Sequence, residues 1–316
     1  MLSAMGLGTY TESTEKRRLS GMIEQRGAQT GMSTFAMFFF GTPFVGVGAF
    51  VALFELKIIS VRSSTQAPAF VLIAFGLVFG LAGLLIWIMA WRQYQSNRRR
   101  VQAGERHVSE PALADYPWDP HGFRSSCWVK VTKAAVGAGF LTLFLSIFNW
   151  WAWIVPGPWM VKIIVSLFDL LLAYVYWQTL LTFSRAARFG SSRIEFVRFP
   201  CRVTDPVEVR WLTPPGINRA NKGSFTLRCV KEFYETTGTG ENRTRNVVHE
   251  EQWNGAWSFG KPENFPRGKS IELKFEPAVN LPATCLSGPG TVFWEFEVNL
   301  SLPGPDFKET YLVPVY

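Results

Sequence analysis

Histidine and cysteine supply many of the general bases, nucleophiles and metal ligands of enzymes, and both are few in this chain. Its 316 residues include three histidines and four cysteines, none at H-E-x-x-H, C-x-x-C or paired-histidine spacing. His121 and Cys127 share a polar segment with Asp115 and Asp119. Zinc needs three or four convergent ligands, so a solvated loop is the simpler interpretation. The sequence also lacks a G-x-x-x-x-G-K-[ST] phosphate loop and a G-x-S-x-G elbow. We therefore expect no catalytic residue, no metal site, no cofactor and no enzyme activity.

One carboxylate, Asp169, lies inside a long apolar run. An ionised group at that depth in a bilayer costs at least about 2.5 kcal/mol, so it should face protein or water. Ser146 and Asn149 lie at a similar depth on the preceding run. A hydrogen-bonded Asp169 that ties the two runs together is the interpretation we favour. The alternative is an ion or proton site, which would need a second carboxylate or a basic partner at that depth.

Four apolar runs must position these side chains, and each is long enough to cross a bilayer, which takes about 20 helical residues. They cover residues 34–54, 69–91, 134–155 and 160–183. The first three contain no charged residue, and the fourth holds Lys162 and Asp169. Charged residues make up only 18% of the chain, below the roughly 25% usual in soluble domains. We therefore predict a four-helix transmembrane region over residues 34–183.

The basic residues predict the orientation, because Lys and Arg concentrate in cytoplasmic loops. Residues 1–33 should form a flexible cytosolic arm, and residues 92–133 a basic cytosolic loop. The arm, this loop and the segment after the fourth run carry 16 basic residues, against three near the two other turns. Both termini are therefore expected in the cytosol of a cell whose inner (plasma) membrane holds the chain.

The net charge of +8 belongs mainly to the membrane half. Residues 184–316 contain 17 basic and 15 acidic residues, a net charge of only +2. The excess therefore indicates topology and anionic lipid, and we expect no nucleic-acid partner. Arg98, Arg99 and Arg100 directly follow the second run, at the level of the phosphate headgroups, and are the candidate lipid contacts.

Small residues mark possible helix contacts. Gly76 and Gly80 form a G-x-x-x-G pair in the second run. This spacing lets two backbones approach closely in lipid. The partner could be another helix of the same chain or a second copy.

Residues 184–316 show the alternation of apolar and polar residues that is typical of strands. Gly, Pro and Asn separate the runs. Seven short strands in about 130 residues predict a cytosolic antiparallel β-sandwich of immunoglobulin-like type, with an eight-stranded barrel as the alternative. The predicted strands cover residues 192–199, 207–212, 225–233, 247–253, 270–275, 291–302 and 310–316.

Several short motifs occur in an order that can be compared with known protein families. They are Tyr116-Pro117-Trp118, Arg188-Phe189-Gly190-Ser191-Ser192, Leu227-Arg228-Cys229, Glu251, Trp253, Leu281-Pro282-Ala283-Thr284, Trp294, Pro303-Gly304-Pro305-Asp306-Phe307 and Leu312-Val313-Pro314-Val315. Their order resembles a family of uncharacterised bacterial multi-pass membrane proteins with a C-terminal cytosolic β-sandwich. The ending is also similar to arrestin-like sandwiches. The resemblance covers about half the chain and implies no known activity.

These observations lead to two hypotheses about function. The first is a membrane-anchored interaction protein that presents a β-sandwich at the cytosolic face to a protein partner or a second copy. The alternative is an oligomeric small transporter or channel with Asp169 in the path. The loop of residues 92–133 carries Tyr116, Trp118 and Trp128, which need a surface to cover. We expect this loop to pack against the sandwich, with insertion of Trp118 at the lipid interface as the alternative.

Overall fold

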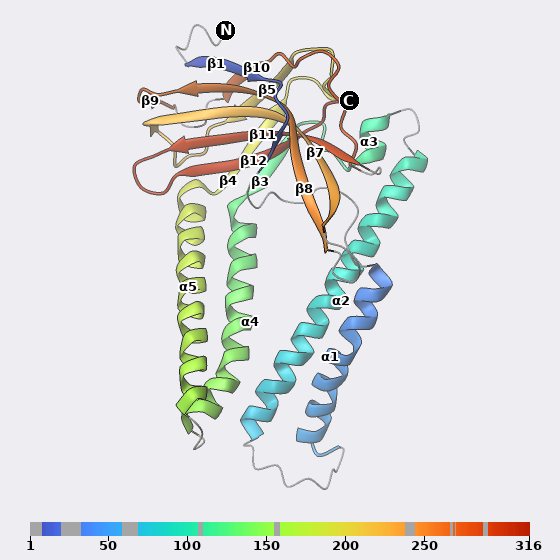
Figure 1. Cartoon of the computed structure of the whole chain (residues 1–316), viewed down its shortest axis with the longest axis vertical. Coiled ribbons are helices and arrows are strands. Elements are labelled where there is room, and N and C mark those ends of the chain that lie inside the picture. The colour runs from blue at the N-terminus through green and yellow to red at the C-terminus, as the bar shows by residue number, and fades with distance from the viewer. Residues whose placement is uncertain are drawn as a thin grey trace. The chain divides into compact units, whose positions relative to one another are not determined.

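The computed structural model describes residues 8–19, 33–58, 69–106, 110–154, 159–237, 244–265, 268, 270–286 and 290–316. The chain divides into two compact units (Figure 1). The β unit comprises Met1–Gln29, Arg100–Trp128 and Ser184–Tyr316. The helix unit comprises Thr30–Arg99 and Val129–Phe183. Three separate stretches of the sequence thus build the β unit.

Four helices are long and apolar enough to cross a membrane. A fifth, α3, is short. The helices are α1 (Thr34–Glu55), α2 (Ala69–Arg106), α3 (Pro111–Asp115), α4 (Cys127–Ile154) and α5 (Trp159–Phe189). The prediction of four long apolar helices is confirmed.

Three of the helices extend past the predicted limits, because an apolar run marks only part of a helix. Helix α2 continues to Arg106 instead of ending near residue 91, and α5 continues to Phe189 instead of residue 183. Helix α4 begins at Cys127 instead of near residue 134. Arg, Gln and Ala are good helix formers, so polar turns continue the helix beyond the apolar run.

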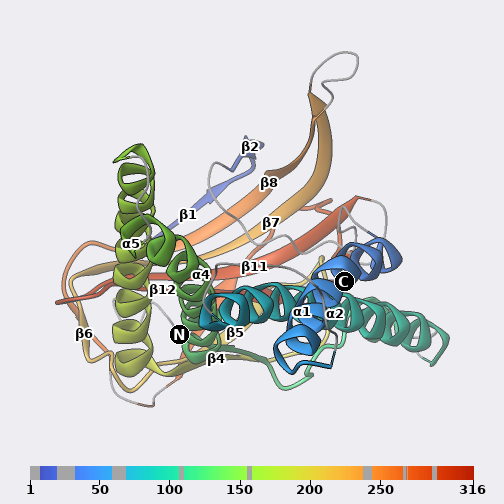
Figure 2. The same cartoon turned by 90° about the horizontal axis from the view of Figure 1, so that it is seen from below.

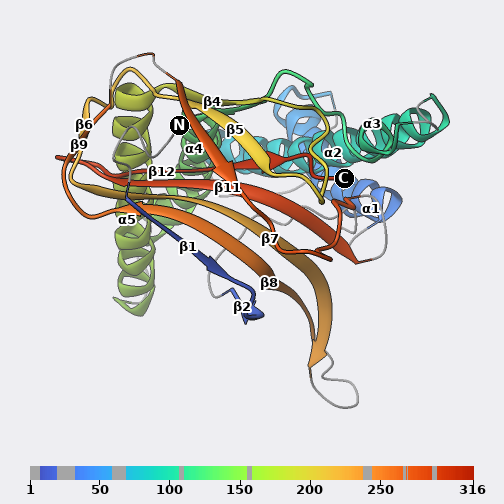
Figure 3. The same ribbon diagram turned by 90° about the horizontal axis from the view of Figure 1, so that it is seen from above.

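The β unit contains two main antiparallel sheets (Figures 2 and 3). The first has the order β1-β8-β7-β11-β12, with β2 also on β8, and the second the order β10-β5-β4-β3. The small strands β6 (Arg219–Ala220) and β9 (Glu263–Asn264) form a separate pair. The strands of the first sheet are β1 (Thr9–Ser13), β2 (Arg17–Arg18), β7 (Lys222–Thr237), β8 (Thr244–Phe259), β11 (Thr291–Ser301) and β12 (Phe307–Val313). Those of the second are β3 (Phe123–Ser126), β4 (Ser191–Phe196), β5 (Val207–Leu212) and β10 (Ser270–Phe275). Each of the seven predicted strand segments overlaps one of these strands, which confirms the prediction of a C-terminal antiparallel β region.

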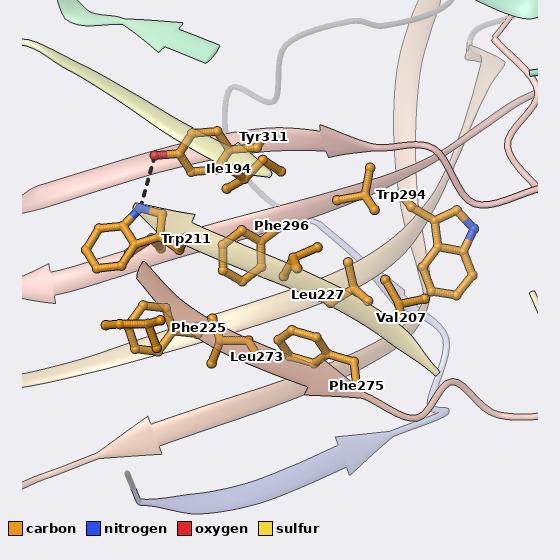
Figure 4. Close-up of a cluster of buried hydrophobic side chains, with 14 of the residues drawn as sticks. Ile194, Val207, Trp211, Phe225, Leu227, Leu273, Phe275, Trp294, Phe296 and Tyr311 are labelled. Atoms are coloured by element: carbon orange, nitrogen blue, oxygen red, sulfur yellow. Dashed lines mark hydrogen bonds between the residues drawn. The ribbon is translucent and has the colours of Figure 1, made fainter. Parts of the chain in front are cut away.

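One hydrophobic core joins the inner faces of the two sheets. Trp211 of β5 packs on Phe225 of β7, with ring centroids 5.6 Å apart, and its indole N–H donates to the hydroxyl of Tyr311 at 3.4 Å (Figure 4). Each large side chain that is fully buried in this way stabilises the fold by about 1.5–3 kcal/mol. The residues labelled in Figure 4 are all at most 1% exposed: Ile194, Val207, Trp211, Phe225, Leu227, Leu273, Phe275, Trp294, Phe296 and Tyr311.

The N-terminal segment differs from the flexible arm that the sequence predicts over residues 1–33. Thr9–Ser13 and Arg17–Arg18 are strands that pair with β8, as Figure 2 shows. Residues 1–7 and 20–32 lie outside the described part. The reason for the difference is non-local: the edge of β8 offers unpaired backbone N–H and C=O groups, and this segment satisfies them.

The predicted basic loop of residues 92–133 also differs, because Arg100–Trp128 belongs to the β unit. Strand β3 in this stretch pairs with β4, placing Phe123 opposite Ile194 and Ser126 opposite Ser191. The expected packing of the loop against the strands is confirmed by this pairing.

Two helices continue directly into this strand pair. Strand β3 ends at Ser126 and α4 begins at Cys127, and a single residue, Gly190, separates α5 from β4. Gly190 has a φ of 63°, a left-handed value that glycine adopts freely and that often ends a helix. Its N–H donates to the carbonyl of Ala186 at 2.8 Å, and its carbonyl accepts from the N–H of Cys127 at 3.2 Å. The ends of α4 and α5 are thus hydrogen-bonded where they become strands.

Candidate functional site

Asp169 and Asn149 meet between α4 and α5. The side-chain amide of Asn149 donates to Oδ1 of Asp169 at 2.8 Å and to the carbonyl of Leu145 at 3.3 Å. Ser146, the third residue of the predicted polar site, is exposed and donates to the carbonyl of Leu143 at 2.7 Å. The structure therefore brings two of the three predicted residues together and directs the third to its own helix.

A second polar contact between these helices lies one heptad away from the first. The hydroxyls of Thr142 and Tyr176 are 2.8 Å apart, and each residue is seven positions from Asn149 or Asp169. The buried residues of α4 in this stretch, Ala138, Leu145 and Ala152, repeat at the same spacing. A seven-residue repeat of apolar residues is the pattern of left-handed helix packing. The arrangement makes Asn149 and Asp169 part of a helix-pairing seam.

Gly76 and Gly80 lie against α1 of the same chain. A Cβ atom built on Gly48 of α1 would be 2.5 Å from the Cα of Gly80 and 2.9 Å from the carbonyl oxygen of Gly76. One built on Gly76 would be 2.8 Å from Cγ1 of Val51. The absence of side chains lets the two backbones touch, so these glycines serve contact within the chain.

The predicted lipid-binding arginines lie on the polar extension of α2. Arg98 is exposed. The side chains of Arg99 and Arg100 are outside the described part. Their place on a continuous helix, after the apolar turns end, is compatible with headgroup contact.

Asp115, which the sequence analysis considered only as a possible metal ligand, is a buried carboxylate of the β unit. Asp115, at the end of α3, is 7% exposed. It accepts from the backbone N–H of Leu286 at 2.8 Å and from the hydroxyl of Tyr316 at 2.8 Å. The indole N–H of Trp118 in turn donates to the Tyr316 oxygen at 3.1 Å. This Asp115 cluster (Asp115, Trp118, Leu286 and Tyr316) fastens α3 to the C-terminal strand region.

Apolar contacts surround the Asp115 cluster. Trp118, Leu286 and Ala112 pack with Val230, Phe293 and Leu312, which lie on the strands of the first sheet. Burial raises the pKa of the Tyr316 phenol above its ordinary value, and the nearby Asp115 carboxylate adds to the rise. Trp118 is 6% exposed and belongs to the core of the β unit, so the structure places it in this core and not at a lipid interface.

Four further buried carboxylates, among them Glu309 and Glu232, have hydrogen-bond partners. Glu309 of β12 accepts from the hydroxyl of Ser125 at 2.8 Å and from the thiol of Cys127 at 3.5 Å. Glu232 of β7 lies 3.1 Å from Nε2 of His249 on β8. Within the described residues no group of three His, Cys, Asp or Glu side chains is arranged to hold a metal ion.

The cysteines of the core are inert at neutral pH. Burial raises the pKa of the Cys201 and Cys229 thiols to about 12, so both stay protonated. Cys127 is also buried, whereas Cys285 is only partly so. Cys201 and Cys229 are therefore core thiols, whereas the thiol of Cys285 is partly accessible.

The edge of β8 holds the N-terminal segment through side chains as well as backbone. The indole N–H of Trp253, which is fully buried, donates to Oε1 of Glu12 at 2.7 Å. The ring of Tyr10 packs on that of Trp257 with centroids 5.0 Å apart. No sequence signal points to this contact, because it joins residues more than 240 positions apart.

The chain matches no protein-family model and no curated protein sequence. Among solved structures it is similar to Spo0M, a sporulation control protein from Bacillus subtilis, with a TM-score of 0.23 and 12% identity. The match covers 35% of this chain and 41% of that one, so the chain spans less than half the length of the protein it matches. A similarity of this size assigns neither a fold nor a function.

Proposed function

We propose that the chain is a membrane-anchored interaction protein. Its four apolar helices would span the inner (plasma) membrane, and its β unit would form a cytosolic sandwich of immunoglobulin-like or arrestin-like type that binds another protein. The observation that carries the proposal is the composition of the β unit. It gathers the segment before α1, the segment between α2 and α4 and the segment after α5. In a chain that crosses a membrane four times, these are the three segments that share one side.

The orientation of this topology has independent support. The three segments that fold together hold 11 of the 16 basic residues counted above, and basic loops stay in the cytosol. Reporter fusions at Ser3 and after Tyr316 should both report the cytosol, and a fusion within residues 156–158, between α4 and α5 in the sequence, should report the outside. A C-terminal fusion outside the cytosol would overturn the placement of the β unit.

The way in which the β unit is attached supports a binding role. No residue separates β3 from α4 and one residue separates α5 from β4, so the connections between the sandwich and the membrane helices would be short. Edges and loops of such domains commonly serve recognition. Arg98, Arg99 and Arg100 would contact anionic lipid.

The Asn149–Asp169 hydrogen bond supports a structural role for this intramembrane pair and weighs against the transporter or channel alternative. Asp169→Asn tests the point, because asparagine keeps an acceptor oxygen but cannot carry charge. An unchanged growth phenotype at unchanged protein level would remove the basis for conduction through Asp169. A lost phenotype at unchanged stability would favour it.

The binding role is tested on the whole chain in native membranes. A tagged chain should recover a stoichiometric protein partner, or an untagged second copy when both are expressed together. Membranes that contain only the untagged chain are the control for background. Recovery of neither a partner nor a second copy would contradict the proposal.

A further inference from the structure

We propose that the edge of β8 is a binding site for an extended peptide that presents an aromatic side chain and, two residues later, a carboxylate. In this structure the chain's own residues 8–19 occupy the site. The proposal rests on the function proposed above, because it names the surface and the kind of partner. It commits to a second copy of this chain, whose own residues 8–19 carry this pattern, and a segment of another protein is an outcome of the test.

Backbone pairing provides the first part of the site. β1 runs antiparallel to β8, with Thr9 opposite Ser258 and Ser13 opposite Asn254. In the described part of the chain β1 pairs with no other strand. The segment therefore binds as peptides bind in strand addition, where main-chain hydrogen bonds provide affinity and side-chain pockets provide specificity.

A buried indole provides the pocket for the carboxylate. Trp253 belongs to the core and has no exposed surface, yet its N–H points to the strand edge and donates to Glu12 at 2.7 Å. Glu12 itself is exposed. A hydrogen bond to a charged acceptor is stronger than one to a neutral acceptor, so a ligand that lacks the carboxylate leaves a core donor without its partner.

The aromatic pocket is formed by a glycine and a second tryptophan. Tyr10 packs on Trp257, whose own N–H donates to the carbonyl of Lys274 at 3.0 Å and fixes the ring. Gly255 stands between the two tryptophans in β8, and a Cβ atom built there would be 2.6 Å from the Tyr10 hydroxyl oxygen. The site thus has room for an aromatic ring because position 255 has no side chain.

The remainder of the segment adds a basic contact. Arg18 donates to both carboxylate oxygens of Glu235 at 3.2 Å each, and the N–H of Leu19 donates to the carbonyl of His249 at 2.9 Å. Peptide pattern and site therefore match at three positions: aromatic, acidic and basic.

The occupant is short, because β1 contains five residues and β2 two. An intramolecular segment competes at an effective concentration in the millimolar range, so a partner must match its chemistry to displace it.

The test uses the full-length chain in detergent with a fluorescent peptide of residues 8–19, followed by anisotropy. Tyr10→Ala with Glu12→Ala in the chain weakens its own segment and leaves Trp253, Gly255 and Trp257 intact. We expect this vacated chain to bind the peptide at least tenfold more tightly than the wild-type chain does. A peptide with Glu12→Ala should bind the vacated chain at least tenfold more weakly than the wild-type peptide. The single variant Glu12→Ala replaces the double variant if the latter does not give a cooperative thermal transition.

A matched receptor variant checks the mechanism. Trp253→Phe in the vacated chain keeps a ring but removes the N–H, so the two peptides should then bind equally. A wild-type dimer that the peptide dissociates would support the site and identify a second copy as the partner. No saturable binding to a folded vacated chain, or equal binding of both peptides to it, would refute the proposal. The pull-down and the fusions would be unaffected by that failure, since they test binding and topology of the whole chain.

Discussion

Replacing Asp115 should release the segment that joins α2 to α4 from the β unit. Asp115→Ala leaves two donors without their acceptor, the N–H of Leu286 and the hydroxyl of Tyr316. Leaving a buried donor unsatisfied costs about 1–3 kcal/mol, so the free energy of unfolding should fall by about 4 kcal/mol, within a range of about 2–6. That loss is a large fraction of the 5–15 kcal/mol typical of a folded domain.

Thermal unfolding of the whole chain in one detergent, followed by near-ultraviolet circular dichroism, measures this loss. Hydrogen exchange should show faster exchange over residues 110–126 in the variant. Asp119→Ala is the matched control, because Asp119 is exposed and the one contact described for its side chain is a hydrogen bond from the nearby N–H of His121 at 3.0 Å. Tyr316→Phe with Asp115→Ala should cost less than the two single changes added, since both remove the same hydrogen bond. If the free energies of unfolding of Asp115→Ala and Asp119→Ala agree within about 0.5 kcal/mol, the cluster does not hold this segment.

Four further outcomes follow from the structure. Asp169→Leu should destabilise the helix pair by about 1 kcal/mol in detergent, whereas Asp169→Asn should not; equal losses would show that charge and not the acceptor matters. Gly48→Val should disrupt the α1–α2 contact and lower the melting temperature, whereas Gly46→Val, where a Cβ meets nothing within 4 Å, should not. Because burial raises the pKa of Tyr316, its contribution to stability is full below its ordinary pKa of 10.0 and is lost as pH rises further; Tyr316→Phe should flatten this alkaline decline in a pH series of melting temperatures. A maleimide at pH 8 should modify Cys285 before the three buried thiols, and mass spectrometry of the labelled native chain checks the order.

The elements that follow from local pattern could be predicted from the sequence. The uncharged run of residues 34–54 corresponds closely to α1, Thr34–Glu55, because the length of an apolar run can be read directly from consecutive residues. The alternating segments around Ile194 and Phe296 became β4 and β11 for the same reason. The ends of α2 and α5 could not be placed, since polar helix formers continue a helix without any apolar signal.

The contacts of the candidate sites could be predicted only where the contacting residues recur at regular spacing in the sequence. Asn149 and Asp169 were selected from the sequence. Thr142 and Tyr176 lie seven residues from them, and this spacing in the sequence indicates that the two helices pack together. Glu12 gives no such signal, because its strand β1 contains one apolar residue and its partner Trp253 is 241 positions away in the sequence. Edge pairing of that kind depends on what the rest of the fold leaves open.

Because β3 leads directly into α4 and α5 into β4, the register of the strand pair and the alignment of the adjoining helix ends depend on each other. A helix pair can slide and repack after about one turn, 5.4 Å, whereas a strand pair returns its side chains to the same face only after two residues, about 6.8 Å. The two step lengths do not match, and Gly190 alone provides slack between α5 and β4. Because of this mismatch, the register of β3 on β4 and the hydrogen bond from the N–H of Cys127 to the carbonyl of Gly190 together fix where α4 begins relative to the end of α5.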